Sequence, residues 1–332
     1  MSATSPQRIT LIGLGTIGMS MAALHLARDN VIVDVFDTRP DINQYILATL
    51  PNFLGQDPLS TDSSFQPSAS AVASLISAGR LYIHTCLETA CASATIIQEQ
   101  GPENVEFKQS LWAQVESLAP PSAHFWTSTS GIAASAQQRN MRDKTRLLVV
   151  HPFNPPHIMP LLEIVPSPDT SPERVGFARE YFSVPGSRHR PVVLRKEIPG
   201  FVGNRLAFAL LREACYLVQE DVVNAKDLDT ILMASLGLRW AGNGVFESYQ
   251  QGGGEGGIQA FLEKLGGTMQ EVWDSLGRVN VLGNDEADWK EKVVSQVNEA
   301  YGTLTPGQVR EKEDRLKSFL VTQSKKYGHD ES

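Results

Sequence analysis

A histidine and a glutamate flank a proline-rich stretch and could together move a proton. His151 ends the apolar run Leu147–Val150, and Glu163 follows after Pro152-Phe-Asn-Pro-Pro156. An imidazole titrates near neutral pH, and a carboxylate can orient it and stabilise its charged form, which suits a general base for an alcohol proton. The same segment is equally compatible with a core histidine and a surface glutamate.

A glycine-rich turn near the N-terminus could bind a diphosphate. The motif Gly13-Leu-Gly-Thr-Ile-Gly18 follows a short apolar run and opens a helix-forming run. Gly13 permits a tight turn, Gly15 lets the backbone approach a pyrophosphate, and Gly18 lets helix and strand pack closely. Thr16 and Ile17 lie where the free N–H groups and the dipole of the helix favour an anion. A purely structural turn is the alternative, but this context favours a dinucleotide site.

An acidic residue at the end of the second apolar run indicates which dinucleotide binds. Asp37 follows Val31–Phe36 and is placed to accept hydrogen bonds from both adenosine ribose hydroxyls. A carboxylate there repels a 2′-phosphate, so NAD is favoured over NADP. Arg39 could partly compensate, or could stack on the adenine.

Short apolar segments predict the strands that must position these residues. They are Ile9–Ile12, Val31–Phe36, Ala94–Ile97, His124–Thr127, Leu147–Val150 and Val192–Leu194. Helix-like stretches separate them, which predicts an α/β fold with a Rossmann-type, doubly wound parallel sheet. The carboxyl ends of such strands face the ligand crevice, so His151 is expected where a nicotinamide would lie.

The pattern changes after Leu194. A long run with helical spacing, Phe201–Glu220, follows Pro199-Gly200, and no strand-like alternation appears beyond it. We therefore expect an NAD-binding domain over residues 1–195 and an all-α domain over residues 196–332. The glycine-rich segment Gly252–Gly257 reads as a flexible connection between helices, with a lid hinge as the alternative.

Composition argues against several classes of partner. The chain has 29 Lys and Arg against 37 Asp and Glu, a formal net charge of −8, so nucleic acid and anionic membranes are not expected partners. No apolar stretch reaches the roughly 18 residues that a membrane span needs. Three cysteines cannot form a disulfide framework, and no CxxC pair suggests zinc, so we expect a cytosolic protein without a metal site.

Five motifs, in order along nearly the whole chain, resemble the 3-hydroxyacyl-CoA dehydrogenase superfamily. They are Gly13-Leu-Gly-Thr-Ile-Gly18, Ile97–Asn104 with Lys108, Ser128-Thr-Ser130-Gly, His151–Pro156 with Glu163, and Gly200-Phe-Val-Gly-Asn204-Arg205. Within the superfamily the chain looks like the branch of lambda-crystallin (L-gulonate 3-dehydrogenase) and the carnitine dehydrogenases. The signs of that branch are Pro155-Pro156, Glu163–Thr170 and Ser235–Ala241.

The resemblance implies roles for four catalytic residues. His151 matches the family's general base, and Glu163 matches the carboxylate that orients it. Ser130 and Asn204 match the polar groups that hold the reacting oxygen and the nicotinamide end. A helix-capping amide is the alternative for Asn204.

The resemblance also extends to the cofactor cleft. Glu99 and Lys108 match positions that line it, and Asn154 matches a position near the nicotinamide. His157 has no catalytic counterpart and reads as a variable wall residue. Two departures, at Gly203 and at Gly244-Val245, put the substrate in doubt rather than the reaction.

The activity that follows is oxidation of a small 3-hydroxy acid, or reduction of the 3-oxo acid, with NAD. A 3-hydroxyacyl-CoA dehydrogenase is one alternative, and an NAD-binding, crystallin-like structural protein is another. The joint presence of the four catalytic matches argues against the structural protein. The family further implies a homodimer formed through the helical domain.

One segment favours a free acid over a CoA thioester. Proteins usually meet the phosphates of CoA with lysine or arginine. Acyl-CoA members of the superfamily carry a lysine-rich hairpin after the second strand, whereas Pro40–Gly79 contains neither lysine nor arginine. A free carboxylate needs a single cation, for which Arg239 is the candidate. A surface or inter-subunit ion pair is the alternative for Arg239.

Overall fold

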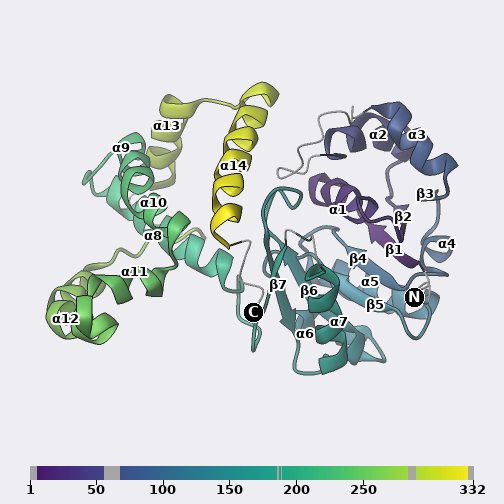
Figure 1. The fold of residues 1–332 in the computed structure, drawn as a ribbon, viewed down its shortest axis with the longest axis horizontal. Helices are drawn as coiled ribbons and strands as arrows, with labels where there is room; N and C mark the ends of the chain where they lie inside the picture. Colours follow the sequence, from purple (N-terminus) through teal and green to yellow (C-terminus); the bar gives the residue numbers. More distant parts are fainter. Residues whose placement is uncertain (1–5, 56–67, 185–186, 188, 283–288, 328–332) are drawn as a thin grey trace. The chain divides into compact units, whose positions relative to one another are not determined.

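The computed structural model describes residues 6–55, 68–184, 187, 189–282 and 289–327. The chain forms two compact units, residues 1–204 and 205–332, and Figure 1 labels most of their helices and strands. The division falls after residue 204 rather than after residue 195. The reason is local, because the backbone N–H groups of Val202 and Gly203 bond to Glu163 in the first unit.

Eight strands of the first unit form one sheet in the order β3-β2-β1-β4-β5-β6-β7-β8. Their bounds are β1 (Gln7–Ile12), β2 (Val31–Phe36), β3 (Leu81–His84), β4 (Ile96–Glu99), β5 (His124–Thr127), β6 (Leu147–Pro152), β7 (Leu161–Pro166) and β8 (Arg190–Val193). Strands β1 to β6 are parallel, whereas β7 pairs antiparallel with β6 and parallel with β8. The mostly parallel sheet confirms the predicted α/β class.

The sheet departs from the predicted one at β3 and β7, neither of which the sequence patterns predict. Strand β7 includes Pro166 as its last residue, and a proline within an apolar run argues against a strand in a sequence pattern. The reversed direction of β7 and β8 is therefore a correction to the expected all-parallel sheet.

Helices cover both faces of the sheet (Figure 1). Their bounds are α1 (Thr16–Leu26), α2 (Ile42–Thr49), α3 (Ala69–Ser77), α4 (Leu87–Cys91), α5 (Val105–Leu118), α6 (Ala134–Gln137) and α7 (Pro172–Phe182), with 3₁₀ turns η1 (Leu50–Asn52), η2 (Gln138–Asn140) and η3 (Lys144–Arg146). Successive residues of a strand point to opposite faces. Leu11 accordingly packs in one apolar core with Met19 of α1, whereas Ile12 packs in the other with Trp112 of α5. The sheet is doubly wound.

Every regular element among the described residues of the second unit is helical, which confirms the prediction. Its elements are α8 (Gly203–Gln219), which begins at the end of the first unit, α9 (Ala225–Leu232), the π-helical turn η4 (Met233–Gly237), α10 (Leu238–Gly242), α11 (Val245–Gly252), the 3₁₀ turn η5 (Gly254–Gly256), α12 (Gly257–Ser275), α13 (Trp289–Tyr301) and α14 (Pro306–Tyr327). The glycine-rich segment forms the turn between α11 and α12, where Gly254 and Gly257 have positive φ angles of 60° and 59°. Among the helices described, none is long and apolar enough to cross a membrane.

Candidate active site

His151 and Glu163 face each other across the antiparallel pair β6–β7. They are direct partners in the register of the two strands. Nδ1 of His151 lies 2.8 Å from Oε2 of Glu163, and both residues are buried. The pairing that the sequence suggested is therefore present, and it arises through a strand that the sequence did not predict.

Glu163 is held at both carboxylate oxygens. Its Oε1 accepts hydrogen bonds from the backbone N–H groups of Val202, at 3.0 Å, and Gly203, at 2.9 Å. Burial by itself would raise the pKa of Glu163, but the hydrogen bonds from His151, Gly203 and Val202 outweigh it and lower the pKa below its usual value. Glu163 is therefore an ionised, acceptor-only partner of the imidazole.

This pairing fixes which nitrogen of His151 can act as a base. An ionised carboxylate only accepts hydrogen bonds, so Nδ1 carries the proton. In the described chain, Nε2 makes no hydrogen bond. The imidazole ring packs against two aromatic side chains: its centroid is 5.1 Å from that of Phe153 and 5.5 Å from that of Phe201.

Asn204 and Ser130 are also brought together. Nδ2 of Asn204 donates to the backbone oxygen of Ser130 at 2.9 Å. Because Val202 and Gly203 bind Glu163 and the next residue binds Ser130, one short segment connects all four residues expected to be catalytic. A Cβ at Gly203 would lie 2.1 Å from the ring of Phe153, so this departure from the family pattern reflects space that the phenyl ring already occupies.

The glycine-rich turn has the geometry of a diphosphate site. Gly13 has a φ of 91°, and a Cβ on Gly18 would lie 2.1 Å from the carbonyl oxygen of Gly13. A Cβ on Gly15 would meet no atom within 4 Å, so a ligand could approach the backbone there, before the N-terminus of α1. Oδ2 of Asp37 accepts the N–H of Leu14 at 2.7 Å, which ties the acidic residue to the turn. These residues fit a dinucleotide.

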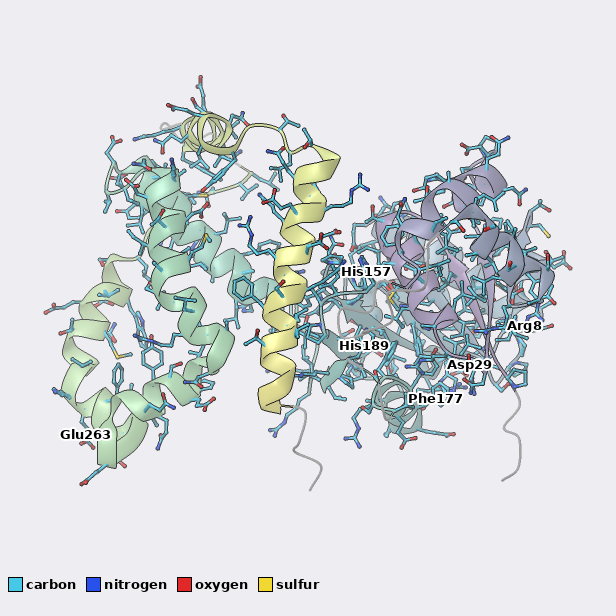
Figure 2. All side chains as sticks on the ribbon, turned by 45° about the horizontal axis from the view of Figure 1, so that its top comes forward. Arg8, Asp29, His157, Phe177, His189 and Glu263 are labelled. Atoms are coloured by element: carbon cyan, nitrogen blue, oxygen red, sulfur yellow. The ribbon has the colours of Figure 1, made fainter. Side chains whose placement is uncertain are left out.

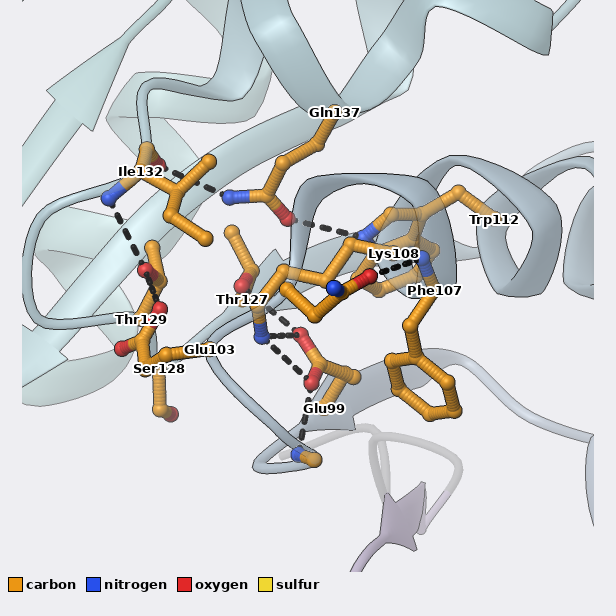
Figure 3. Close-up of polar contacts among 12 residues, drawn as sticks. Glu99, Glu103, Phe107, Lys108, Trp112, Thr127, Ser128, Thr129, Ile132 and Gln137 are labelled. Atoms are coloured by element: carbon orange, nitrogen blue, oxygen red, sulfur yellow. Dashed lines mark hydrogen bonds and ion pairs between the residues drawn. The ribbon is translucent and has the colours of Figure 1, made fainter.

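Glu99 and Lys108 form a buried ion pair (Figure 3). Nζ of Lys108 lies 2.7 and 2.8 Å from the two carboxylate oxygens of Glu99, and the two residues are 1% and 0% exposed. Glu99 also accepts the hydroxyl of Thr127 and the N–H of Gly101. The polar atoms of the pair therefore bond to one another, to the loop after β4 at Gly101 and to β5 at Thr127.

Three further residues singled out from the sequence lie in different surroundings. Asn154 is exposed in the segment after β6. His157, labelled in Figure 2, is buried, and its Nδ1 lies 2.9 Å from the hydroxyl oxygen of Ser20 in α1. Arg239 is exposed in α10 of the second unit. His157 thus contacts the helix that follows the glycine-rich turn.

Glu103 is a site residue that sequence reasoning missed. Its carboxylate accepts the hydroxyl of Thr129 at 2.6 Å (Figure 3). It also accepts the N–H of Ser130 at 2.5 Å. The hydroxyl oxygen of Thr129 in turn accepts the N–H of Ile132 at 3.0 Å. In the sequence Glu103 stands beside Asn104, the N-cap of α5, where an acidic residue is ordinary, so no local pattern signalled the contact.

Comparison with known proteins shows the family to which the chain belongs. The family model for the NAD binding domain of 3-hydroxyacyl-CoA dehydrogenase matches residues 8–198, and that for its C-terminal domain matches residues 200–288. A 3-hydroxyacyl-CoA dehydrogenase of Gibberella moniliformis is 33% identical over 96% of this chain and 95% of its own length. An L-carnitine dehydrogenase of Streptomyces coelicolor is 32% identical over 82% of this chain and 83% of its own.

Solved structures share the fold. The NAD+ dependent 5-formyl-3-hydroxy-2-methylpyridine 4-carboxylic acid 5-dehydrogenase has a TM-score of 0.74 at 24% identity, covering 96% of this chain and 98% of its own. A 3-hydroxyacyl-CoA dehydrogenase of Archaeoglobus fulgidus has a TM-score of 0.63 at 21% identity, covering 96% and 99%. At these identities the likeness concerns the fold alone.

Proposed function

Because the chain belongs to the 3-hydroxyacyl-CoA dehydrogenase family and is an NAD-dependent dehydrogenase, we propose that its substrate is a small, free 3-hydroxy or 3-oxo carboxylic acid. The observation that carries the proposed chemistry is the His151–Glu163 pair, with Nδ1 bonded to an ionised carboxylate and Nε2 left for substrate.

In the direction of oxidation, Nε2 of His151 takes the proton of the C3 hydroxyl. The glycine-rich turn and Asp37 would hold NAD, which would supply the acceptor for the hydride that leaves C3. Glu163 holds the imidazole in the tautomer that can act as a base, and it stabilises the imidazolium that forms. Ser130 and Asn204 hold the oxygen on C3. In the reverse direction His151 returns the proton to the oxygen of the 3-oxo acid.

The glycine-rich turn and Asp37 are proposed to bind the pyrophosphate and the adenosine ribose of NAD, respectively. Support comes from the open approach at Gly15 and from the bond that joins Asp37 to Leu14. Glu99 and Lys108 are proposed to shape the nicotinamide end of the cleft through the loop at Gly101. Asn154 is proposed to lie near the nicotinamide.

Two observations favour a free acid. Pro40–Gly79 carries no lysine or arginine to meet the phosphates of CoA. Several relatives are named for L-carnitine, which is itself a free 3-hydroxy acid. Arg239 is the proposed cation for the carboxylate, and it makes no ion pair within the part of the chain that the structure describes.

The second candidate is a 3-hydroxyacyl-CoA substrate, which the name of the relative from Gibberella moniliformis favours. A panel of free 3-hydroxy acids and 3-hydroxybutyryl-CoA, assayed by NADH absorbance, separates the two. We expect turnover of at least one free acid, weak or no turnover of the thioester, and a raised KM for the acid in Arg239→Ala. Efficient thioester turnover with inert free acids would establish the second candidate.

We also propose that the protein is a homodimer formed through its helical unit. Helix α8 leaves Leu206, Phe208 and Leu211 exposed at 63%, 60% and 55%, and apolar surface of this kind usually has a partner. Light scattering after size exclusion should give twice the mass of the chain, and Phe208→Glu should lower it. A monomer at micromolar concentration would refute this assignment.

A further inference from the structure

Arg39 is held between an aromatic ring and an acidic residue. Its guanidinium carbon lies 3.6 Å from the ring centroid of Tyr45, which is on α2 and packs against the apolar core of the first unit. On another side, Nε of Arg39 lies 3.4 Å from Oδ1 of Asp37. No hydrogen bond satisfies that buried Nε within the described residues, so the ring and the ion pair are what hold the side chain.

Asp37 is already engaged before any ribose binds. Its Oδ2 accepts the N–H of Leu14 at 2.7 Å, and its Oδ1 accepts the N–H of Arg39 at 2.9 Å. A carboxylate has about four acceptor positions, so sites remain for the ribose hydroxyls. The charge presented to the ribose is nevertheless that of an Asp37–Arg39 pair. The acidic residue alone is therefore not sufficient to explain exclusion of a 2′-phosphate.

The position of the Arg39 guanidinium determines whether it can bind a 2′-phosphate. An arginine free to turn offers a planar fork that binds a phosphate through two hydrogen bonds. In this structure one face of the fork lies on Tyr45 and its Nε edge faces Asp37. A 2′-phosphate would have to draw Arg39 off the ring and away from the carboxylate, while itself lying beside Asp37.

We propose that Tyr45 is a positioning residue for cofactor specificity: its ring keeps Arg39 beside Asp37 and thereby withholds the guanidinium from the 2′-phosphate of NADP. The proposal rests on the proposed contact between Asp37 and the adenosine ribose. It assigns the choice of cofactor to three residues, of which Tyr45 need not touch the cofactor at all.

The test compares the dissociation constants of NADH and NADPH, measured by fluorescence titration, in wild type, Tyr45→Leu and Tyr45→Phe. The readout is the ratio Kd(NADPH)/Kd(NADH). Because the two cofactors differ only by the 2′-phosphate, general damage to the fold changes both constants and largely cancels in the ratio. Cation–π contacts of this kind predict a fall in the ratio of roughly three- to tenfold for Tyr45→Leu. Tyr45→Phe keeps the ring and should stay within about twofold of wild type.

A double-mutant cycle asks whether Tyr45 acts through Arg39. In an Arg39→Ala background, Tyr45→Leu should no longer change the ratio. If the change persists there, Tyr45 contacts the cofactor directly and the positioning role is wrong. An unchanged ratio in Tyr45→Leu itself also overturns the proposal.

Two further variants, Arg39→Lys and Asp37→Ala, distinguish failure of the positioning role of Tyr45 from failure of the ribose contact of Asp37. Arg39→Lys retains the charge without the flat stacking surface, so the ratio should fall; this tests the same idea if Tyr45→Leu does not fold. Asp37→Ala tests the underlying ribose contact. If Asp37→Ala leaves both the NADH affinity and the ratio unchanged, the proposed function of Asp37 fails, whatever Tyr45 does.

Discussion

At the scale of single residues, His151 turns Nδ1 toward Glu163, and its Nε2 is the atom that we propose as the base. His151→Ala should lower turnover by about 10²–10⁴-fold, the usual contribution of a general acid–base group. The Kd of NADH should change little, because the imidazole acts on the substrate. His157→Ala is the comparison variant. If His157→Ala abolished turnover and His151→Ala stayed within a few-fold of wild type, the base would be assigned to the wrong histidine.

Glu163→Gln tests whether Glu163 sets the tautomer of His151, and it leaves the imidazole itself in place. The N–H groups of Val202 and Gly203 would take the amide oxygen, so the amide nitrogen would face Nδ1 of His151. Nδ1 would then have to accept, and Nε2 would carry the proton and could not act as a base. We expect kcat to fall by about 10²-fold or more, with NADH affinity retained.

The pKa of Glu163 predicts the pH range over which the substitution Glu163→Gln lowers kcat. The pKa of Glu163 lies below its usual value, so the carboxylate stays ionised throughout the range in which a histidine titrates. Glu163→Gln should therefore lower kcat at every pH from about 6 to 9. Glu173→Gln, at an exposed position in α7, is the matched control and should behave as wild type. An equal loss in that control would show that charge removal alone, and not the tautomer, explains the effect.

At the scale of elements, the loop between β4 and α5 binds the loop after β5 through hydrogen bonds. The loop after β5 contains Ser130 and is bound by Glu103, which stands in the loop between β4 and α5. Glu103→Gln keeps the size of the side chain and removes the charge that receives the two bonds. Glu103 is exposed, where an intramolecular hydrogen bond contributes about 0.5–1.5 kcal/mol, so we expect kcat/KM to fall by roughly three- to tenfold.

Glu106→Gln is the control for Glu103→Gln, and the quantities to compare are kcat, the substrate KM and the Kd of NADH. Glu106→Gln changes an exposed acid in the first turn of α5 and should have no effect. A positioning role for Glu103 predicts a change in kcat and substrate KM with an unaltered Kd for NADH. A weaker NADH affinity as the main effect would instead make Glu103 a cofactor ligand.

At the scale of the whole first unit, His25 connects several elements. Its Nε2 lies 2.9 Å from Oε1 of Gln98 in β4, and its Nδ1 lies 2.8 Å from the hydroxyl of Tyr181 in α7. Gln98 then donates to the hydroxyl of Ser128, beside the Ser130 loop. Burial lowers the pKa of His25 to about 3, so this histidine is neutral in the folded protein.

The buried His25 predicts a loss of stability in acid. The unfolded chain binds a proton on this histidine below its ordinary pKa, whereas the folded chain does not until about pH 3, so stability falls as the pH is lowered through that window. By pH 5.5 the loss from His25 is on the order of 1 kcal/mol. His25→Gln should give a shallower dependence of the unfolding midpoint on pH between 7.5 and 5.5. An unchanged slope would contradict the assignment. His124, whose pKa is also lowered to about 3, contributes separately to the pH dependence of stability.

Much of the first unit could be predicted from the sequence because its signals are local. The glycine-rich turn, Asp37 after β2, and the strand His124–Thr127 are each defined within a short stretch by turn chemistry or apolar pattern, and the structure has them where they are expected. The apolar run Leu147–Val150 predicted a strand that ends at His151, and the structure has His151 near the end of β6. That this end faces a ligand is an expectation from the rule for parallel strands.

Other features depended on the tertiary structure. Glu163 faces His151 only because β7 runs antiparallel to β6 in one particular register, and Glu103 reaches Ser130 only because two loops meet. The stacking of Arg39 on Tyr45 depends likewise on how α2 packs. Such contacts join residues that are not adjacent in the sequence. The residues on either side of each one give no local sequence signal that predicts the contact. A one-residue change of strand register would turn Glu163 to the other face of the sheet, and no local pattern specifies that register.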